Sequence, residues 1–150
     1  MRKFEIAKGF ENEEITLPHR GTKYSAGYDI HSIETYTLKP HEKHVFKTGI
    51  KACMEEDEVL LIVVRSSIGI KKGLMLANTI GVIDSDYYSN PSNDGHIMIC
   101  LLNTNDYEVT IDKGERIAQG IFTKYLVTDD DCSNEERKGG VGSTGHWLFS

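Results

Sequence analysis

The apolar residues of this chain come in short runs, and clusters of turn-forming residues separate them. One run, Val59 to Val64, has six apolar residues in a row and is rich in β-branched side chains. Such a run favours a strand that is buried on both faces. A helical period is not sustained for long, and only residues 68–72 are a candidate short helix. The segments that we expect to be strands are residues 36–40, 45–50, 59–64, 97–102 and 117–122.

Many short strands at close spacing predict an all-β sandwich or barrel. The 150 residues fit a single domain that can bury a core. From residue 129 to residue 145 apolar residues almost vanish, and acidic, Ser, Asn and Gly residues replace them. A segment of that composition cannot hold itself in a core. We therefore expect a β domain over residues 1–128 and a flexible C-terminal arm over residues 129–150.

Charge and cysteine content restrict the partners. A net charge of −6 argues against sequence-independent binding to a nucleic-acid backbone, but basic groups that converge locally can still bind a phosphate-bearing ligand. The three cysteines, Cys53, Cys100 and Cys132, form no CxxC pair, so neither a zinc site nor a disulfide framework is indicated. Reduced cysteines in a cytoplasmic protein are the simplest account. We also expect no signal peptide and no membrane span.

Residues 81–88 place two carboxylates and two phenols directly after a short apolar stretch. A carboxylate such as Asp84, held at a pocket wall, can take a proton from water. The ring of Tyr87 or Tyr88 offers a flat face to a sugar or a base. The alternative is an ordinary acidic turn between two strands, and this segment alone does not decide between the two.

Two further segments contain groups that suit phosphate oxygens. Arg65, Ser66 and Ser67 end the apolar run at residues 59–64 with a guanidinium and two hydroxyls, and Arg presents a rigid fork of donors to phosphate. Residues 138–145 are rich in glycine, so backbone N–H groups can turn toward an anion. The alternatives are a surface charge for Arg65 and a floppy tail for the glycines. A floppy segment that also binds phosphate is what a closing lid requires.

Together these segments resemble the five motifs of the homotrimeric deoxyuridine triphosphatase (dUTPase) family, in the family's order. The longer loop at residues 88–94 makes the chain similar to some phage and Gram-positive members. The five matching segments are residues 26–30, 65–69, 78–87, 114–119 and 139–145.

The resemblance implies a distorted jelly-roll (β-clip) sandwich that assembles as a trimer. Each of its three active sites would combine residues of all three subunits. It implies hydrolysis of dUTP to dUMP and pyrophosphate, with Mg²⁺ held mainly by the triphosphate and by waters.

The resemblance also implies a role for each matching residue. Asp84 would be the general base that activates the attacking water, and Tyr87 would stack under the deoxyribose and exclude a ribose 2′-hydroxyl. Asp29 would orient a metal-bound water or support the subunit junction, with no direct metal ligand in the protein. Uracil would be bound by Asn78, Gly81, Val82, Ile83 and Met98. Phosphates would be bound by Arg65, Ser66, Ser67, Gln119 and Arg137, with Gly142, Ser143 and Thr144 closing over them.

The chain departs from the family pattern in its arm, where Val141 replaces an aromatic residue that stacks on uracil. Arg137 also stands one residue closer to that position than the family's arginine. Our hypothesis is that Trp147 or Phe149 supplies the missing ring. The alternative is that these two residues dock on a neighbouring subunit.

Two other functions remain open. A dCTP deaminase of the same fold would need a carboxylate that activates water against the base, and residues 96–103 offer no extra glutamate. A phage-type regulatory protein would use nucleotide as a switch and engage a protein partner, and the loop at residues 89–94 is the only feature that favours it.

Overall fold

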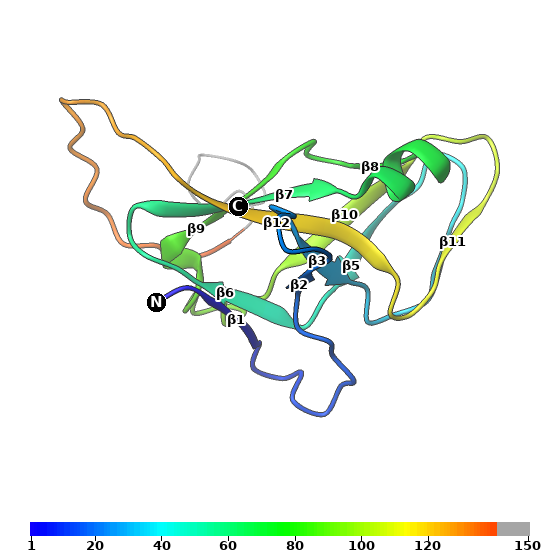
Figure 1. The fold of residues 1–150 in the computed structure, drawn as a ribbon, viewed down its shortest axis with the longest axis horizontal. Coiled ribbons are helices and arrows are strands. Elements are labelled where there is room, and N and C mark those ends of the chain that lie inside the picture. The colour runs from blue at the N-terminus through cyan, green and yellow to red at the C-terminus, as the bar shows by residue number, and fades with distance from the viewer. Residues whose placement is uncertain (141–150) are drawn as a thin grey trace.

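The computed structural model describes residues 1–140, and almost all regular structure in that part of the chain is β-strand (Figure 1). The largest sheet has five strands in the order β2 (His19–Arg20), β3 (Tyr28–His31), β12 (Arg116–Lys124), β7 (Glu58–Val64) and β9 (Gly81–Asp84). A second sheet has the order β5 (Lys43–Lys47), β10 (Met98–Asn103) and β8 (Leu74–Leu76). Two further pairs are β1 (Lys3–Ile6) with β6 (Ile50–Cys53) and β4 (Tyr36–Leu38) with β11 (Val109–Ile111). The all-β prediction is confirmed.

Strand β7 is central because its apolar run packs on both sides. It pairs with β12 along one edge and with β9 along the other, both antiparallel. Leu60 and Ile62 point into the core and are almost fully buried, while Leu61 and Val63 are half-buried on the other face. The interior between the sheets is filled by branched and aromatic side chains, among them Ile30, Phe46, Leu60, Ile62, Ile99, Leu101 and Ile117.

The prediction of one strand over residues 45–50 is wrong. The chain breaks after Lys47: β5 pairs with β10, whereas β6 pairs with β1 in a different sheet. Gly49 lies at the break with a φ of 72°, a left-handed conformation that glycine adopts without the steric penalty of a Cβ. The chain therefore changes its partner strand within a segment that we expected to be one strand.

The helical elements within residues 1–140 are short. The candidate helix at residues 68–72 is a single wide turn, η1 (Ser67–Lys71), in which the N–H of Lys72 donates to the carbonyl of Ser67 at 3.2 Å. A second turn, η2 (Ser85–Tyr87), follows β9 directly. Neither is long enough to cross a membrane.

The segment after β12 leaves the sheet and then returns to it (Figure 1). Residues 125–136 are exposed, and Arg137 is the first residue after them that is partly buried. It comes back to the end of β9 and to η2, where it contacts Asp84 and Asp86. The arm thus reaches one of the two cavities described next.

Candidate active site

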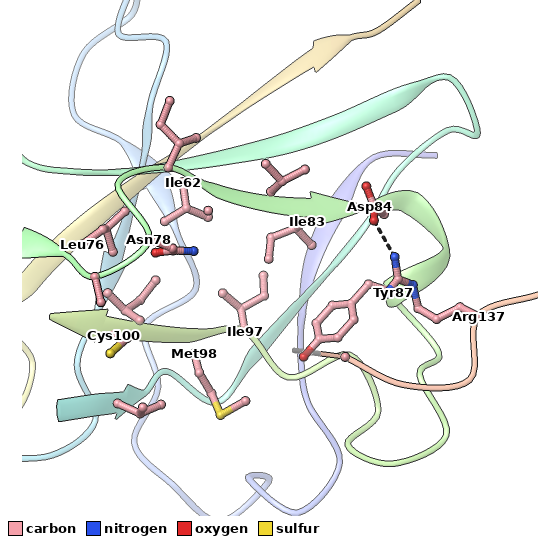
Figure 2. Close-up of a pocket in the computed structure, with 17 residues that line it drawn as sticks. Ile62, Leu76, Asn78, Ile83, Asp84, Tyr87, Ile97, Met98, Cys100 and Arg137 are labelled. Atoms are coloured by element: carbon pink, nitrogen blue, oxygen red, sulfur yellow. Dashed lines mark hydrogen bonds and ion pairs between the residues drawn. The ribbon is translucent and has the colours of Figure 1, made fainter. Parts of the chain in front are cut away.

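The first cavity, here called the apolar pocket, has a volume of about 640 Å³ and lies between β9 and β10. Figure 2 shows Leu76 and Asn78 at one end of it and Asp84, Tyr87 and Arg137 at the other. Its floor is made of buried aliphatic side chains, and its polar groups lie at the two ends. The predicted site residues that line it are Asn78, Gly81, Val82, Ile83, Asp84, Tyr87, Met98 and Arg137.

One wall of the apolar pocket is backbone with unused hydrogen-bonding capacity. Strand β9 is the outermost strand of the five-stranded sheet and pairs with β7 on one side only. An edge strand presents N–H and C=O groups along its other side. Because residues 81–84 all line the pocket, these groups can recognise a flat heterocycle whose edge carries donors and acceptors.

Asp84 ends β9 with a carboxylate that is half exposed, and the returning arm binds it. The guanidinium of Arg137 donates through Nη2 to Asp84 Oδ2 and through Nε to Asp86 Oδ1, the latter at 2.7 Å. Its Nη1 donates to the carbonyl of Gly139 at 3.1 Å. The guanidinium carbon lies 5.9 Å from the ring centroid of Tyr87. One cation therefore joins both carboxylates of the 81–88 segment.

The second cavity, here called the cationic pocket, has a volume of about 540 Å³ and lies where β3, β12 and η1 meet. Its lining includes one carboxylate, Asp29, and three cations, Arg65, Lys71 and Arg116. Such a balance suits an anion. The predicted site residues that line it are Asp29, Arg65, Ser66, Ser67 and Gln119.

A buried carboxylate holds the two guanidiniums of the cationic pocket. Asp29 is 6% exposed, and its Oδ1 lies 3.0 Å from Arg65 Nε while its Oδ2 lies 3.5 Å from Arg116 Nη1. Each guanidinium carries five N–H donors, so pairing with one carboxylate leaves others for a ligand. Asp29 therefore orients the cations.

Gln119 is held against the backbone beside Asp29. The two residues face each other across the β3–β12 pair. A Cβ added to Gly27 would lie 2.1 Å from Gln119 Oε1, so any larger residue at position 27 would displace the amide. This close approach explains why the first motif needs glycine next to Tyr28.

The two pockets lie at opposite ends of β7. Asp84 pairs with Val59 near the start of the strand, and Arg65 follows Val64 at its end. The six residue-to-residue steps from Val59 to Arg65 span roughly 20 Å at about 3.3 Å per step. One chain therefore does not bring its predicted base and its predicted phosphate ligands together. Gly142, Ser143, Thr144, Trp147 and Phe149 lie outside the described residues.

Arg116 lies in the fourth matching segment, residues 114–119, but no role was predicted for it; it lines the cationic pocket together with Gln119. In a regular strand, residues three apart point to opposite faces. The pairing of β12 with β3 shifts register between Arg116 and Ala118, and such a bulge inserts one residue. The irregularity allows both side chains to face the same cavity. The available sequence signal was a charged residue at the start of a strand, but the direction of its side chain depends on the bulge.

A magnesium ion fits the cationic pocket as part of a phosphate-bearing ligand. Within residues 1–140 no three His, Cys, Asp or Glu side chains gather where they could hold a metal. Asp29, which we expected to orient a metal-bound water or to support the subunit junction, is paired with two guanidiniums. Mg²⁺ commonly binds through substrate phosphates and waters. The cationic pocket suits the phosphate oxygens that would carry it.

An apolar pocket with a backbone wall, ending at a carboxylate, and a separate cationic pocket on an all-β scaffold define a nucleotide-binding class of protein. The model of the dUTPase family matches residues 13–145. The deoxyuridine 5′-triphosphate nucleotidohydrolase of Lactococcus lactis subsp. lactis (strain IL1403) is 49% identical over 147 residues, which cover 97% of this chain and 98% of that protein. The chain belongs to the dUTPase family.

Solved structures agree with this assignment. The dUTPase of Streptococcus mutans superposes with a TM-score of 0.79 at 42% identity, covering 85% of this chain and 98% of that one. The dUTPase of Staphylococcus bacteriophage 80alpha superposes with a TM-score of 0.71 at 25% identity, covering 92% of this chain and 99% of that one. The predicted jelly-roll class and the family resemblance are both confirmed.

Proposed function

We propose that this chain hydrolyses dUTP to dUMP and pyrophosphate, and that Asp84 activates the attacking water. The observation that carries the proposal is the position of Asp84, at the end of an apolar pocket that has a backbone edge for one wall. A base bound in that pocket directs its sugar and first phosphate toward the carboxylate. The Lactococcus lactis relative is named for this reaction and matches nearly the whole chain.

Uracil would be selected by the edge strand and by Asn78. Backbone N–H and C=O groups of residues 81–84 have fixed directions because β9 is paired to β7. A cytosine would direct its amino group, a donor, at a position of the strand that pairs with an acceptor, and buried polar groups would be left unpaired. Such a mismatch can lower catalytic efficiency by several orders of magnitude. Met98 would cover the base from β10.

The phosphates would be bound by the cationic pocket of a neighbouring copy of the chain. A general base must lie within hydrogen-bond reach of the water it activates, and the phosphate ligands must contact the same nucleotide. The separation of roughly 20 Å along β7 forbids this within one chain. We therefore propose that the active site forms between subunits of a homo-oligomer, with three copies as the family resemblance implies.

In the proposed reaction Asp84 removes a proton from water as the water's oxygen attacks the α-phosphorus, and pyrophosphate leaves. Arg65, Ser66, Ser67 and Gln119 would bind the phosphate oxygens and offset their negative charge. Magnesium, when bound with the triphosphate, would further reduce the repulsion between the nucleophile and those oxygens. Arg137 would exchange its carboxylate partners for the substrate.

We propose that residues 129–150 act as an arm on a body formed by residues 1–128. The exposure of residues 125–136 and the return of Arg137 and Gly140 to Tyr87 support this division. Gly142, Ser143 and Thr144 would then close over the phosphates. The thiols of Cys53, Cys100 and Cys132 are all free, which fits a reducing, cytoplasmic location.

The alternatives find less support. Asp84 is the sole carboxylate among the described residues that line the apolar pocket, and it lies at the opposite end from Asn78, so a deaminase would lack a carboxylate beside the base. The loop at residues 89–94, on which a regulatory function would depend, uses Asn90, Asn93 and Asp94 for contacts within the chain.

A pyrophosphate-release assay across the four common deoxynucleoside triphosphates and dUTP tests the proposal. We expect turnover with dUTP and Mg²⁺ and little with the others. Asp84→Asn should lower kcat by about 10³-fold, as expected when a general base is removed, while dUTP still binds. Equal turnover of dCTP and dUTP, or full activity of the variant, would contradict the proposal.

A further inference from the structure

Residues 88–95, which form most of the connection between η2 and β10, fold inward. Asp94 Oδ2 accepts a hydrogen bond from the N–H of Lys8 at 2.9 Å and lies 3.0 Å from Lys51 Nζ. Asn90 is only 2% exposed, and the ring of Tyr88 lies 4.2 Å from Lys51 Nζ. These contacts fasten the loop to the N-terminal segment and to β6.

What the loop surrounds is the hydroxyl of Tyr87. That hydroxyl donates to the carbonyl of His96 at 2.7 Å, and the side-chain amide of Asn93 donates to it at 2.8 Å through Nδ2. A phenol has one proton, so when it donates to a carbonyl it can only accept from the second partner. Asn93 supplies the donor. The far end of the ring is therefore fixed at two points.

The orientation of the Asn93 amide is itself determined. Its Oδ1 accepts from the N–H of Gly95 at 3.1 Å and from Nδ2 of Asn90 at 2.9 Å, so Nδ2 must face Tyr87. Gly95 has a φ of 77°, and a Cβ there would lie 2.4 Å from the carbonyl oxygen of Tyr88. Only glycine fits this turn, which lies beside Asn93 and helps to hold its amide at the Tyr87 hydroxyl.

The other anchor of Tyr87 is equally fixed. His96 is 5% exposed, and its Nε2 accepts from the N–H groups of Thr48 and Gly49 at 3.3 and 3.0 Å. Its ring packs on Phe10 with centroids 4.4 Å apart. The carbonyl that accepts the hydrogen bond from Tyr87 thus belongs to a residue whose side chain is hydrogen-bonded to Thr48 and Gly49, between β5 and β6.

We propose that Asn93 is a positioning residue for sugar discrimination: it fixes the Tyr87 ring where a ribose 2′-hydroxyl would collide with it. The proposal rests on the proposed function and on the role that the family resemblance implies for Tyr87, which is to stack under the deoxyribose. A ring rejects one additional oxygen atom only if it cannot move aside by about the width of that atom. Two hydrogen bonds at its hydroxyl, opposite the backbone attachment, remove that freedom.

The test compares kcat/KM for dUTP and UTP. Asn93→Asp keeps an oxygen for Gly95 and Asn90 but replaces the donor to Tyr87 with an acceptor. We expect the dUTP-to-UTP ratio to fall about tenfold, mainly because UTP turnover rises. Tyr87→Phe removes both hydrogen bonds of the hydroxyl and should give at least as large a fall. Adding Asn93→Asp to Tyr87→Phe should cause no further fall, because the contact with Asn93 is then already absent. Ser89→Ala, at an exposed position in the same loop, is the matched control and should leave the ratio unchanged.

A second measurement keeps the test independent of turnover. In protein with ¹³C-labelled tyrosine, the Tyr87 ring resonance, identified by its loss in Tyr87→Phe, should shift or broaden in Asn93→Asp and in Asn93→Leu but not in Ser89→Ala. Calorimetry with dUMP and UMP should show the same loss of sugar preference as the kinetics.

The outcomes separate the two proposals. A wild-type protein that does not hydrolyse dUTP overturns the proposed function, while the ring resonance and the dUMP-to-UMP preference still decide the role of Asn93. An unchanged preference in Asn93→Asp, or effects of the two variants that multiply, overturns the positioning role even if the protein loses thermal stability.

Discussion

The apolar pocket and the cationic pocket are built by different means. The apolar pocket is formed by the backbone of an edge strand over a buried aliphatic floor, so strand pairing sets its shape. The cationic pocket is formed by side chains whose positions depend on one buried carboxylate, Asp29. Backbone walls suit recognition of a flat base, and oriented cations suit phosphates. Because the two pockets are separated along β7, each copy in the proposed oligomer would supply half of two different sites.

The largest expected effect comes from mixing two inactive variants. Asp84→Asn disables the apolar pocket and Arg65→Ala the cationic pocket, so neither homo-oligomer should turn over dUTP appreciably. If a site combines the two pockets from different copies, a 1:1 mixture refolded together should regain about one quarter of wild-type activity, because one site in four pairs two intact halves. Pyrophosphate release before and after mixing measures this. If no activity is recovered, the two pockets that serve one site do not come from different copies, and the proposed division between copies is wrong.

The next effect concerns the carboxylate of the cationic pocket. Asp29→Asn should lower the free energy of unfolding by about 2 to 3 kcal/mol, because it leaves two partly buried guanidiniums without their counter-charge. Asp57→Asn is the matched control, since its pair with Lys124 is largely exposed and should change stability by less than about 0.5 kcal/mol. Urea unfolding followed by circular dichroism measures both. Equal small losses would mean that Asp29 does not hold this pocket.

The free energy of unfolding should depend on pH through His96, whose carbonyl accepts the hydrogen bond from Tyr87 at one end of the apolar pocket. Burial lowers the pKa of His96 to about 4 from 6.5, so the unfolded chain binds this proton more readily than the folded one. Its stabilising contribution is complete above pH 6.5 and is lost as the pH falls toward 4, by the order of 2 kcal/mol. Urea unfolding at pH 7 and at pH 4.5 measures the loss.

The control for this titration is His96→Gln, whose amide oxygen can still accept from the backbone. It should show a smaller loss over the same pH range than the wild type. If both proteins lose equal stability, groups other than His96 account for the acid sensitivity. The position of Tyr87 would then not depend on a neutral His96.

The smallest of the four effects tests how the arm meets the apolar pocket. Arg137→Ala should raise KM for dUTP about tenfold, as expected for loss of a charge-assisted contact to phosphate. Lys138→Ala, the exposed neighbour, should have little effect. Steady-state kinetics distinguish the two. An unchanged KM would mean that Arg137 serves only Asp84 and Asp86, and the link between arm and substrate would then be wrong.

Much of the site could be predicted because its parts are local. The residues at 78–87 and at 65–67 each lie on one short segment, and the structure gathers each set around one cavity. Arg116 and Asn93 escaped prediction because their directions depend on a bulge and on a turn at Gly95. Both features are set by contacts between segments far apart in the chain.

The sequence by itself determined the class of fold and the chemical groups at the site. Short runs rich in β-branched residues, such as residues 59–64, favour buried strands, and the motif residues have the same chemical groups wherever they lie. Only the tertiary structure decided that residues 45–50 divide between two sheets and that Asp84 and Arg65 lie at opposite ends of β7. The physical reason is that strand pairing and register depend on long-range partners, which no local pattern specifies.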